Sequence, residues 1–402
     1  IEDMKREIVA GIQTAAPTEN VLELGESAAP TVRLVNSIID RAAAENASDI
    51  HLDPTETELR VRMRIDGVMT SIMAVPKDLQ SSVLARLKIM GGMDITERRI
   101  PQDGRAGVVA HERNYDLRIS TLPTIYGEKV VIRLLDKNSG LLTKERIGLT
   151  GADLQKYQEL LDHSSGVVLI AGPTGSGKSS TMYTMIRQLN TNEVNMMTLE
   201  DPVEYNVDGV NQTQINEKVG MTFASGLRSI LRQDPDVIAV GEIRDGETAE
   251  IAMRAAITGH LVLSTIHTNN APATIDRLRD IGVPNYLIAT ALNGVISQRL
   301  VRRVCPECKE AYTPDTEELA ELGLDPASRL TFYRGGCPNC FGTGYRGRVA
   351  VFEILNMTHR LRNAVSRGAQ LDELMTILKE EGRFTPLEEN CRRLVLEGTT
   401  TT

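Results

Sequence analysis

A glycine-rich segment near the middle of the chain, GPTGSGKSS at residues 172–180, constrains the fold more than any other feature. It fits the phosphate-loop pattern G-x4-GK[ST] in full, with the apolar run GVVLIA before it and a helical pattern after it. Backbone N–H groups of such a loop point at phosphate oxygens, and the helix N-terminus adds partial positive charge. We expect Lys178 to reach the outer phosphates and Ser179 to ligate Mg²⁺. The predicted ATP-binding residues are Gly172, Pro173, Thr174, Gly175, Ser176, Gly177, Lys178, Ser179 and Ser180.

The segments that follow the loop indicate an α/β fold. Apolar runs alternate with helical patterns through VNMMTLED, DVIAVGE and HLVLSTIH. This alternation is typical of a parallel, doubly wound sheet. We therefore expect an ATPase core over residues 151–300.

The rest of the chain divides by pattern. Residues 1–30 are polar and predict a flexible lead-in, whereas residues 31–136 mix helical periodicity (TVRLVNSIIDRAAA, LQSSVLARLKIMGG) with strand alternation (ELRVRMRIDG, NYDLRISTLP, EKVVIRLLD). This combination predicts a small α+β domain joined by a linker at residues 137–150. Residues 301–402 are expected to hold a cysteine-bearing module and then mostly helices.

Acidic residues and histidines at strand ends are candidates for catalysis. Hydrolysis needs a carboxylate near the metal and the attacking water, and Glu242 follows the apolar strand DVIAV. A second acidic group, at the end of MMTLE, comprises Glu200, Asp201 and Glu204. His260 and His267 flank the strand LVLSTI and are candidates for sensing the γ-phosphate. The alternative is that the acids are solvated loop charges and the histidines are structural.

Four of the five cysteines form two CxxC pairs, which comprise Cys305, Cys308, Cys337 and Cys340. Four thiolates suit tetrahedral Zn²⁺, and four protein ligands indicate a structural site. A helix is expected between the pairs, in DTEELAELGL. The alternative is four unliganded thiols, and Cys391 is expected to be a packing residue.

Charge and composition bear on the class of partner. The net charge is -9 and aromatic residues make up 3% of the chain, which disfavours a nucleic-acid-coating surface. No apolar run approaches the roughly 20 residues that span a bilayer, and no signal peptide opens the chain. We expect both ends to be cut, because the chain starts with Ile and ends with GTTTT.

Together these segments resemble a known family. GPTGSGKSS, LEDPVEY, LRQDPDVIAVGEIRD and ITGHLVLSTIHTNNA are similar, in order, to the Walker A, Asp box, Walker B and His box of the secretion ATPase superfamily. ASDIHLDP, RMRIDG, ITERRIPQDGR, DLRISTLPTIYGEKVVIRLLD and the paired cysteines resemble its type IV pilus assembly and type II secretion ATPases, the PilB/GspE group.

The resemblance implies a homo-hexamer with a RecA-like ATPase domain, a preceding PAS-like α+β domain and a zinc-binding module. It also implies a cytoplasmic location, peripheral to the inner membrane, and a platform protein of that membrane as partner. Arginines at the positions of Arg118 and Arg133 are implied to contact the γ-phosphate, with Arg105 as a weaker third candidate. The Walker B acid of the family is commonly Glu, which supports Glu242.

The leading hypothesis is an ATPase that drives type IV pilus assembly, with type II secretion as the alternative. A pilus retraction ATPase is disfavoured, because such proteins generally lack the four cysteines. A nucleic-acid translocase and a non-hydrolysing nucleotide-gated scaffold are further alternatives. They predict DNA-stimulated ATP hydrolysis and binding without turnover, respectively.

Overall fold

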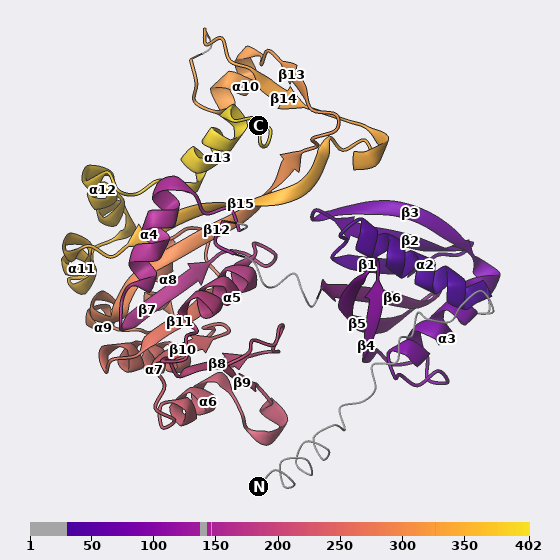
Figure 1. Ribbon diagram of the computed structural model, residues 1–402, viewed down its shortest axis with the longest axis horizontal. Helices are drawn as coiled ribbons and strands as arrows, with labels where there is room; N and C mark the ends of the chain where they lie inside the picture. The colour runs from indigo at the N-terminus through magenta and orange to yellow at the C-terminus, as the bar shows by residue number, and fades with distance from the viewer. Residues whose placement is uncertain (1–29, 137–142, 146, 326) are drawn as a thin grey trace. The chain divides into compact units, whose positions relative to one another are not determined.

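A computed structural model describes residues 30–136, 143–145, 147–325 and 327–402. Residues 1–29 of the expected lead-in lie outside the described residues, and so do residues 137–142 and 146 of the expected linker. The described residues form two compact units, one that ends at Asp136 and one that begins at Thr143 (Figure 1). Among them, no helix is long and apolar enough to cross a membrane.

The first unit is an antiparallel sheet with two helices packed on one face (Figure 1). Its strand order is β3-β2-β1-β6-β5-β4. The elements are α2 (Pro30–Ala44), β1 (Asp49–Pro54), β2 (Glu58–Ile65), β3 (Val68–Pro76), η1 (Lys77–Leu79), α3 (Gln80–Met90), β4 (Gln102–Ala110), β5 (Arg113–Thr124) and β6 (Gly127–Asp136). The helices and strands predicted here are confirmed, while β1, β3 and β4 were not predicted.

Alternation along β2 shows how the sequence produces this layer. Leu59, Val61 and Met63 are fully buried in the core under the helices, and the arginines between them point to the other face. The sheet therefore has one apolar face and one face rich in charged side chains.

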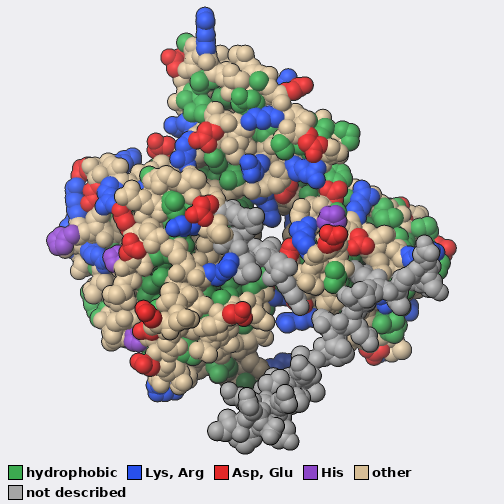
Figure 2. All heavy atoms as spheres, viewed as in Figure 1, with side chains coloured by type: hydrophobic (Ala, Val, Ile, Leu, Met, Phe, Trp, Pro, Cys, Tyr) green, Lys and Arg blue, Asp and Glu red, His purple; other side chains and the backbone are tan. Residues whose placement is uncertain are grey.

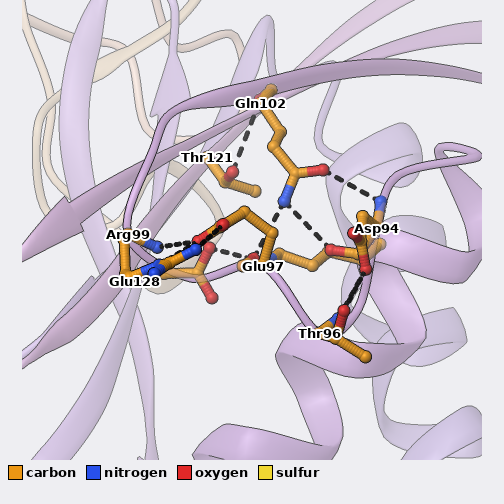
Figure 3. Close-up of polar contacts among 8 residues, drawn as sticks. Asp94, Thr96, Glu97, Arg99, Gln102, Thr121 and Glu128 are labelled. Carbon is orange, nitrogen blue, oxygen red and sulfur yellow. Dashed lines mark hydrogen bonds and ion pairs between the residues drawn. The ribbon is translucent and has the colours of Figure 1, made fainter.

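Polar contacts, one of them a buried ion pair, fix the segment that joins α3 to β4. The Gln102 amide donates to the carbonyl oxygens of Asp94 (2.9 Å) and Glu97 (3.0 Å) and accepts from the Asp94 N–H, as Figure 3 shows. Lys88, 2% exposed, pairs with Glu128 at 2.6 Å and donates to the Glu97 carbonyl oxygen. A buried charge needs such partners, so this segment is held against the sheet.

The second unit is built on a seven-stranded sheet with the order β15-β12-β7-β11-β10-β8-β9. All neighbouring pairs are parallel except β12 and β15. The strands are β7 (Gly166–Ala171), β8 (Met196–Glu200), β9 (Asn211–Gln214), β10 (Val237–Val240), β11 (Leu261–Ile266), β12 (Leu292–Val304) and β15 (Tyr345–Asn356). The predicted α/β fold is confirmed.

Helices cover both faces of this sheet, so its central strands are apolar on both sides. Val168 and Ile170 of β7 pack under α4 (Gly151–Leu161) and α5 (Lys178–Leu189), whereas Val167 and Leu169 face the other helical layer. That second layer contains α6 (Phe223–Ile230), α7 (Gly246–Ile257), α8 (Ala273–Asp280), α9 (Asn285–Ala291), α11 (His359–Ser366) and α12 (Leu371–Glu381).

The two longest strands of the sheet, β12 and β15, form an antiparallel pair that carries the cysteine module at its end (Figure 1). The module contains β13 (Glu310–Tyr312), α10 (Thr316–Glu321), β14 (Phe332–Arg334) and η3 (Pro338–Cys340). The helix expected between the cysteine pairs is α10. After residue 300 we expected the module and then helices, but β15 first returns to the sheet, and α11, α12 and α13 (Leu387–Leu396) follow.

Candidate functional site

The phosphate loop runs from the end of β7 to the start of α5, and its first glycine stands where a larger residue would clash. Gly172 has φ 151°, and a Cβ there would lie 2.5 Å from the Ser176 Oγ and 2.7 Å from the Gln298 carbonyl oxygen. Gly177, the N-cap of α5, has φ 89°. These backbone angles favour glycine, so the loop can bring N–H groups close to a phosphate.

The Lys178 ammonium lies over this loop. It donates to the carbonyl oxygens of Gly172 (2.8 Å) and Pro173 (3.1 Å). Burial lowers the pKa of Lys178, whereas the negative charge of Glu242 raises it. Ser179 is exposed in the first turn of α5. A cationic side chain and a hydroxyl therefore lie at one helix N-terminus, as phosphate and Mg²⁺ binding require.

Acidic and basic side chains gather where β8, β10 and β11 end. The Glu242 carboxylate accepts a short hydrogen bond from Arg244 and lies 3.5 Å from the His267 Nε2. Arg244 also lies 4.0 Å from Asp201. Because these strands are parallel to β7, their carboxyl ends meet at the edge where the phosphate loop begins. Glu242, His267 and Asp201 are therefore on the same edge as Lys178.

Glu200 occupies a different environment from its neighbour Asp201. It is 2% exposed, and its oxygens accept hydrogen bonds from Thr198 (2.6 Å), Gln212 (3.0 Å) and the hydroxyl of Tyr183. The Tyr183 oxygen also accepts the N–H of Glu204 at 3.2 Å. These bonds tie α5 to the segment after β8, so Glu200 supports that segment from inside the protein.

His260 lies at the opposite edge of the sheet from His267. It precedes β11, and its Nδ1 lies 2.9 Å from the Ala255 carbonyl oxygen, at the end of α7. A six-residue strand spans about 20 Å, so His260 and His267 of one chain cannot both reach the same phosphate. The structure brings His267 to Glu242 and does not bring His260 there.

Gln298 and Arg299 of β12 contact the site, although the sequence analysis did not identify them. Gln298, 1% exposed, donates to the Ser176 carbonyl oxygen at 2.7 Å. Arg299 donates to the Asn269 carbonyl oxygen at 2.7 Å, two residues beyond His267. The available signal was the polar run Ser-Gln-Arg within the strand LNGVISQRLV, and that run matches no motif spacing.

In the first unit, three candidate arginines lie side by side on neighbouring strands. The register pairs Arg105 with Arg118 and Arg118 with Arg133. They line a pocket of about 390 Å³ together with Asp49, whose Oδ1 accepts from the Arg133 Nε at 3.1 Å. One row of the sheet thus presents three guanidinium groups and one carboxylate, an arrangement suited to binding an anion.

The four cysteines converge between the ends of β12 and β15. Their sulfur atoms all lie within 4.8 Å of one another, and the Sγ atoms of Cys308 and Cys340 are 3.9 Å apart. Four sulfurs on Zn²⁺ at 2.3 Å would be about 3.8 Å apart. A Cβ on Gly335 would lie 2.7 Å from the Cys308 sulfur, and the Gly336 N–H donates to that sulfur at 3.2 Å. The residues therefore fit a tetrahedral metal ion.

Comparison with known proteins gives a family match over almost the whole chain. The family model described as "Type II/IV secretion system protein" matches residues 25–402. A type II secretion system protein E of Pseudomonas aeruginosa is 46% identical over 385 residues, which cover 96% of this chain and 76% of the relative. A type IV pilus assembly ATPase PilB of Myxococcus xanthus is 44% identical over 409 residues, covering all of this chain and 72% of the relative.

A solved structure of the pilus retraction motor PilT with bound ADP is also similar. It has a TM-score of 0.61 and 28% sequence identity, and the match covers 91% of this chain and 94% of that chain. Of these three proteins, the Myxococcus relative is named an ATPase of pilus assembly, the solved structure is named a pilus retraction motor, and the Pseudomonas relative is named a protein of the type II secretion system.

Proposed function

Because this chain belongs to the type II/IV secretion system protein family, we propose that it is a hexameric motor whose ATP hydrolysis drives type IV pilus assembly. Type II secretion, through pseudopilus assembly, is the second candidate. The resemblance to a secretion ATPase is confirmed, since relatives of both kinds match at 46% and 44% identity. These similar identities support either system.

The observation that carries the proposal is that Lys178 and Glu242 lie at the same edge of the sheet, where its parallel strands end. A phosphate loop alone gives binding, whereas turnover also needs a carboxylate that orients the attacking water. Glu242 follows β10 and is held by Arg244, and His267 lies beside it. In this proposal Glu242 orients the water, His267 responds to the γ-phosphate, and Ser179 would hold Mg²⁺, which neutralises charge on the phosphates when bound.

The first unit supplies the remaining charge in this proposal. Arg118 and Arg133 are proposed to contact the γ-phosphate, with Arg105 beside them in the same row. Since they belong to a separate compact unit, ATP contact by these arginines would couple nucleotide state to the position of that unit. The proposed domain types are PAS-like for the first unit and RecA-like for the ATPase core.

Several partners complete the proposal. Cys305, Cys308, Cys337 and Cys340 would hold a structural Zn²⁺, and an inner-membrane platform protein would bind the hexamer on its cytoplasmic side. Nucleic acid is not an expected partner. In support, cationic and anionic side chains are interspersed over the face shown in Figure 2, without one large patch of positive charge there.

The test is a pair of substitutions. Lys178→Ala should abolish ATP binding, and Glu242→Gln should keep binding but stop turnover. Glu250→Gln is the matched control, because Glu250 is a half-buried α7 residue paired with Arg254. Turnover by Glu242→Gln at the control rate would contradict the assigned role. Capture of a pilus rather than a secretion platform protein would decide between the two systems.

A further inference from the structure

We infer that Gln298 is a positioning residue of the phosphate loop, which turns the Gly177 N–H toward the nucleotide phosphates. The inference rests on the proposed function, since it takes the ligand of the loop to be a nucleotide. It concerns a strand, β12, that carries no recognised nucleotide-binding motif.

The sheet register places Gln298 beside the loop. Ser297 pairs with Ala171, the last residue of β7, so Gln298 lies next to Gly172, where the loop begins. The carbonyl oxygen of Gln298 would be 2.7 Å from a Cβ on Gly172, and its Nε2 would be 3.0 Å from a Cβ on Gly177. Both ends of the loop therefore pack closely on this one residue.

The side chain of Gln298 uses both of its polar atoms. Its Nε2 donates to the Ser176 carbonyl oxygen at 2.7 Å, and its Oε1 accepts from the Thr181 hydroxyl at 2.7 Å. Thr181 is 1% exposed and lies one turn into α5. Because the Thr181 hydroxyl donates to the oxygen, the amide nitrogen is left facing Ser176. The amide thus joins β12, the loop and the first turn of α5.

The bond to Ser176 determines where the next N–H points. The carbonyl of Ser176 and the N–H of Gly177 belong to one planar peptide, in which the two groups point in opposite directions. Holding the carbonyl toward β12 therefore turns the Gly177 N–H away from β12 and toward the loop interior. At the N-terminus of α5, an N–H in that direction can donate to a phosphate oxygen.

The experiment compares two buried amides of the same strand. Gln298→Met keeps the side-chain length but removes both hydrogen bonds. Asn293→Leu is the control, since Asn293 is 6% exposed and donates to the Ser165 carbonyl oxygen at 2.7 Å, at the other end of β7. The dissociation constants of ATP and ADP are measured on the full chain by calorimetry, together with KM, kcat and the melting temperature without nucleotide.

The expected result is that Gln298→Met weakens ATP and ADP binding about 10- to 100-fold, the effect of losing a hydrogen bond to a charged group. The control should bind both nucleotides as the wild-type chain does. Thr181→Val should weaken binding in the same direction but less, because the amide remains and only its orientation is released. KM should rise more than kcat falls, since the loop holds substrate and transition state alike.

The inference is overturned if Gln298→Met binds nucleotides as tightly as Asn293→Leu does. If Gln298→Met does not fold, Thr181→Val takes its place in this comparison. A wild-type chain that binds no nucleotide would instead overturn the proposed function, so the two failures are distinguishable.

Discussion

Replacing Tyr183 by Phe removes one hydroxyl that joins α5 to the segment after β8. That hydroxyl donates to Glu200 and accepts the N–H groups of Glu204 (3.2 Å) and Tyr205 (3.3 Å). Burial and the bond to Glu200 raise the pKa of Tyr183, so the hydroxyl keeps its proton. The ring itself is retained in the variant, including its edge-to-face contact with Tyr205 at 5.2 Å.

The loss can be estimated from these partners. A hydrogen bond to a charged group contributes about 1.5–3 kcal/mol, and a buried donor left without an acceptor adds to the loss. We therefore expect the second unit to lose about 3 kcal/mol of stability. For a unit of this size, each kcal/mol lowers the melting temperature by about 2–4 °C, so the variant should melt about 6–12 °C lower.

Tyr157→Phe is the matched control. Tyr157 is fully buried in the same core cluster, and within the described residues its hydroxyl has no hydrogen-bond partner. Differential scanning calorimetry should place this control within about 2 °C of the wild-type chain, as its only change is one unbonded oxygen. If both variants melt together, the Tyr183 hydroxyl does not stabilise the segment after β8 and this reasoning fails.

Two further outcomes are expected. Arg118→Ala or Arg133→Ala should lower kcat by about 10³-fold or more with little change in ATP affinity, because a guanidinium matters most when the γ-phosphoryl is in transfer. Arg60→Ala, which changes an exposed arginine of the same sheet paired with Glu58, should leave steady-state kinetics unchanged; equal kinetics in all three variants would refute the assignment. Metal analysis of unchelated protein should find one Zn²⁺ per chain, retained in Cys391→Ser and lost in Cys308→Ser, and substoichiometric zinc would contradict the site.

Much of the site could be predicted, because the carboxyl ends of parallel strands share one edge. Lys178, Glu242 and His267 each follow a short apolar run, so strand prediction alone places them on that edge. The same logic did not separate the two ends of β11, and it therefore grouped His260 with His267. Position along a strand, rather than proximity in sequence, decides which residue reaches the ligand.

The remaining contacts depend on packing between distant segments. Gln298 lies 122 residues after Ser176, and nothing in its local sequence indicates that β12 runs beside β7. Glu200 and Asp201 are adjacent in sequence, but Glu200 is enclosed by hydrogen bonds from Tyr183, Thr198 and Gln212, whereas Asp201 is exposed. The fold class followed from periodicity, whereas the return of β15 to the sheet required the tertiary structure.

The β12–β15 pair also determines where a segment of this chain could be replaced by protein engineering. Its hydrogen-bonded register runs from Gly294 opposite Asn356 to Val304 opposite Tyr345, so the ladder closes just before Cys305. Everything from Cys305 to Gly344 is thus an insertion at a hairpin tip, where a two-residue turn would also satisfy the backbone. Exchanging or removing this insertion would keep the strand order of the sheet but would uncover Val395 of α13, on which Leu319 and Phe332 of the insertion pack.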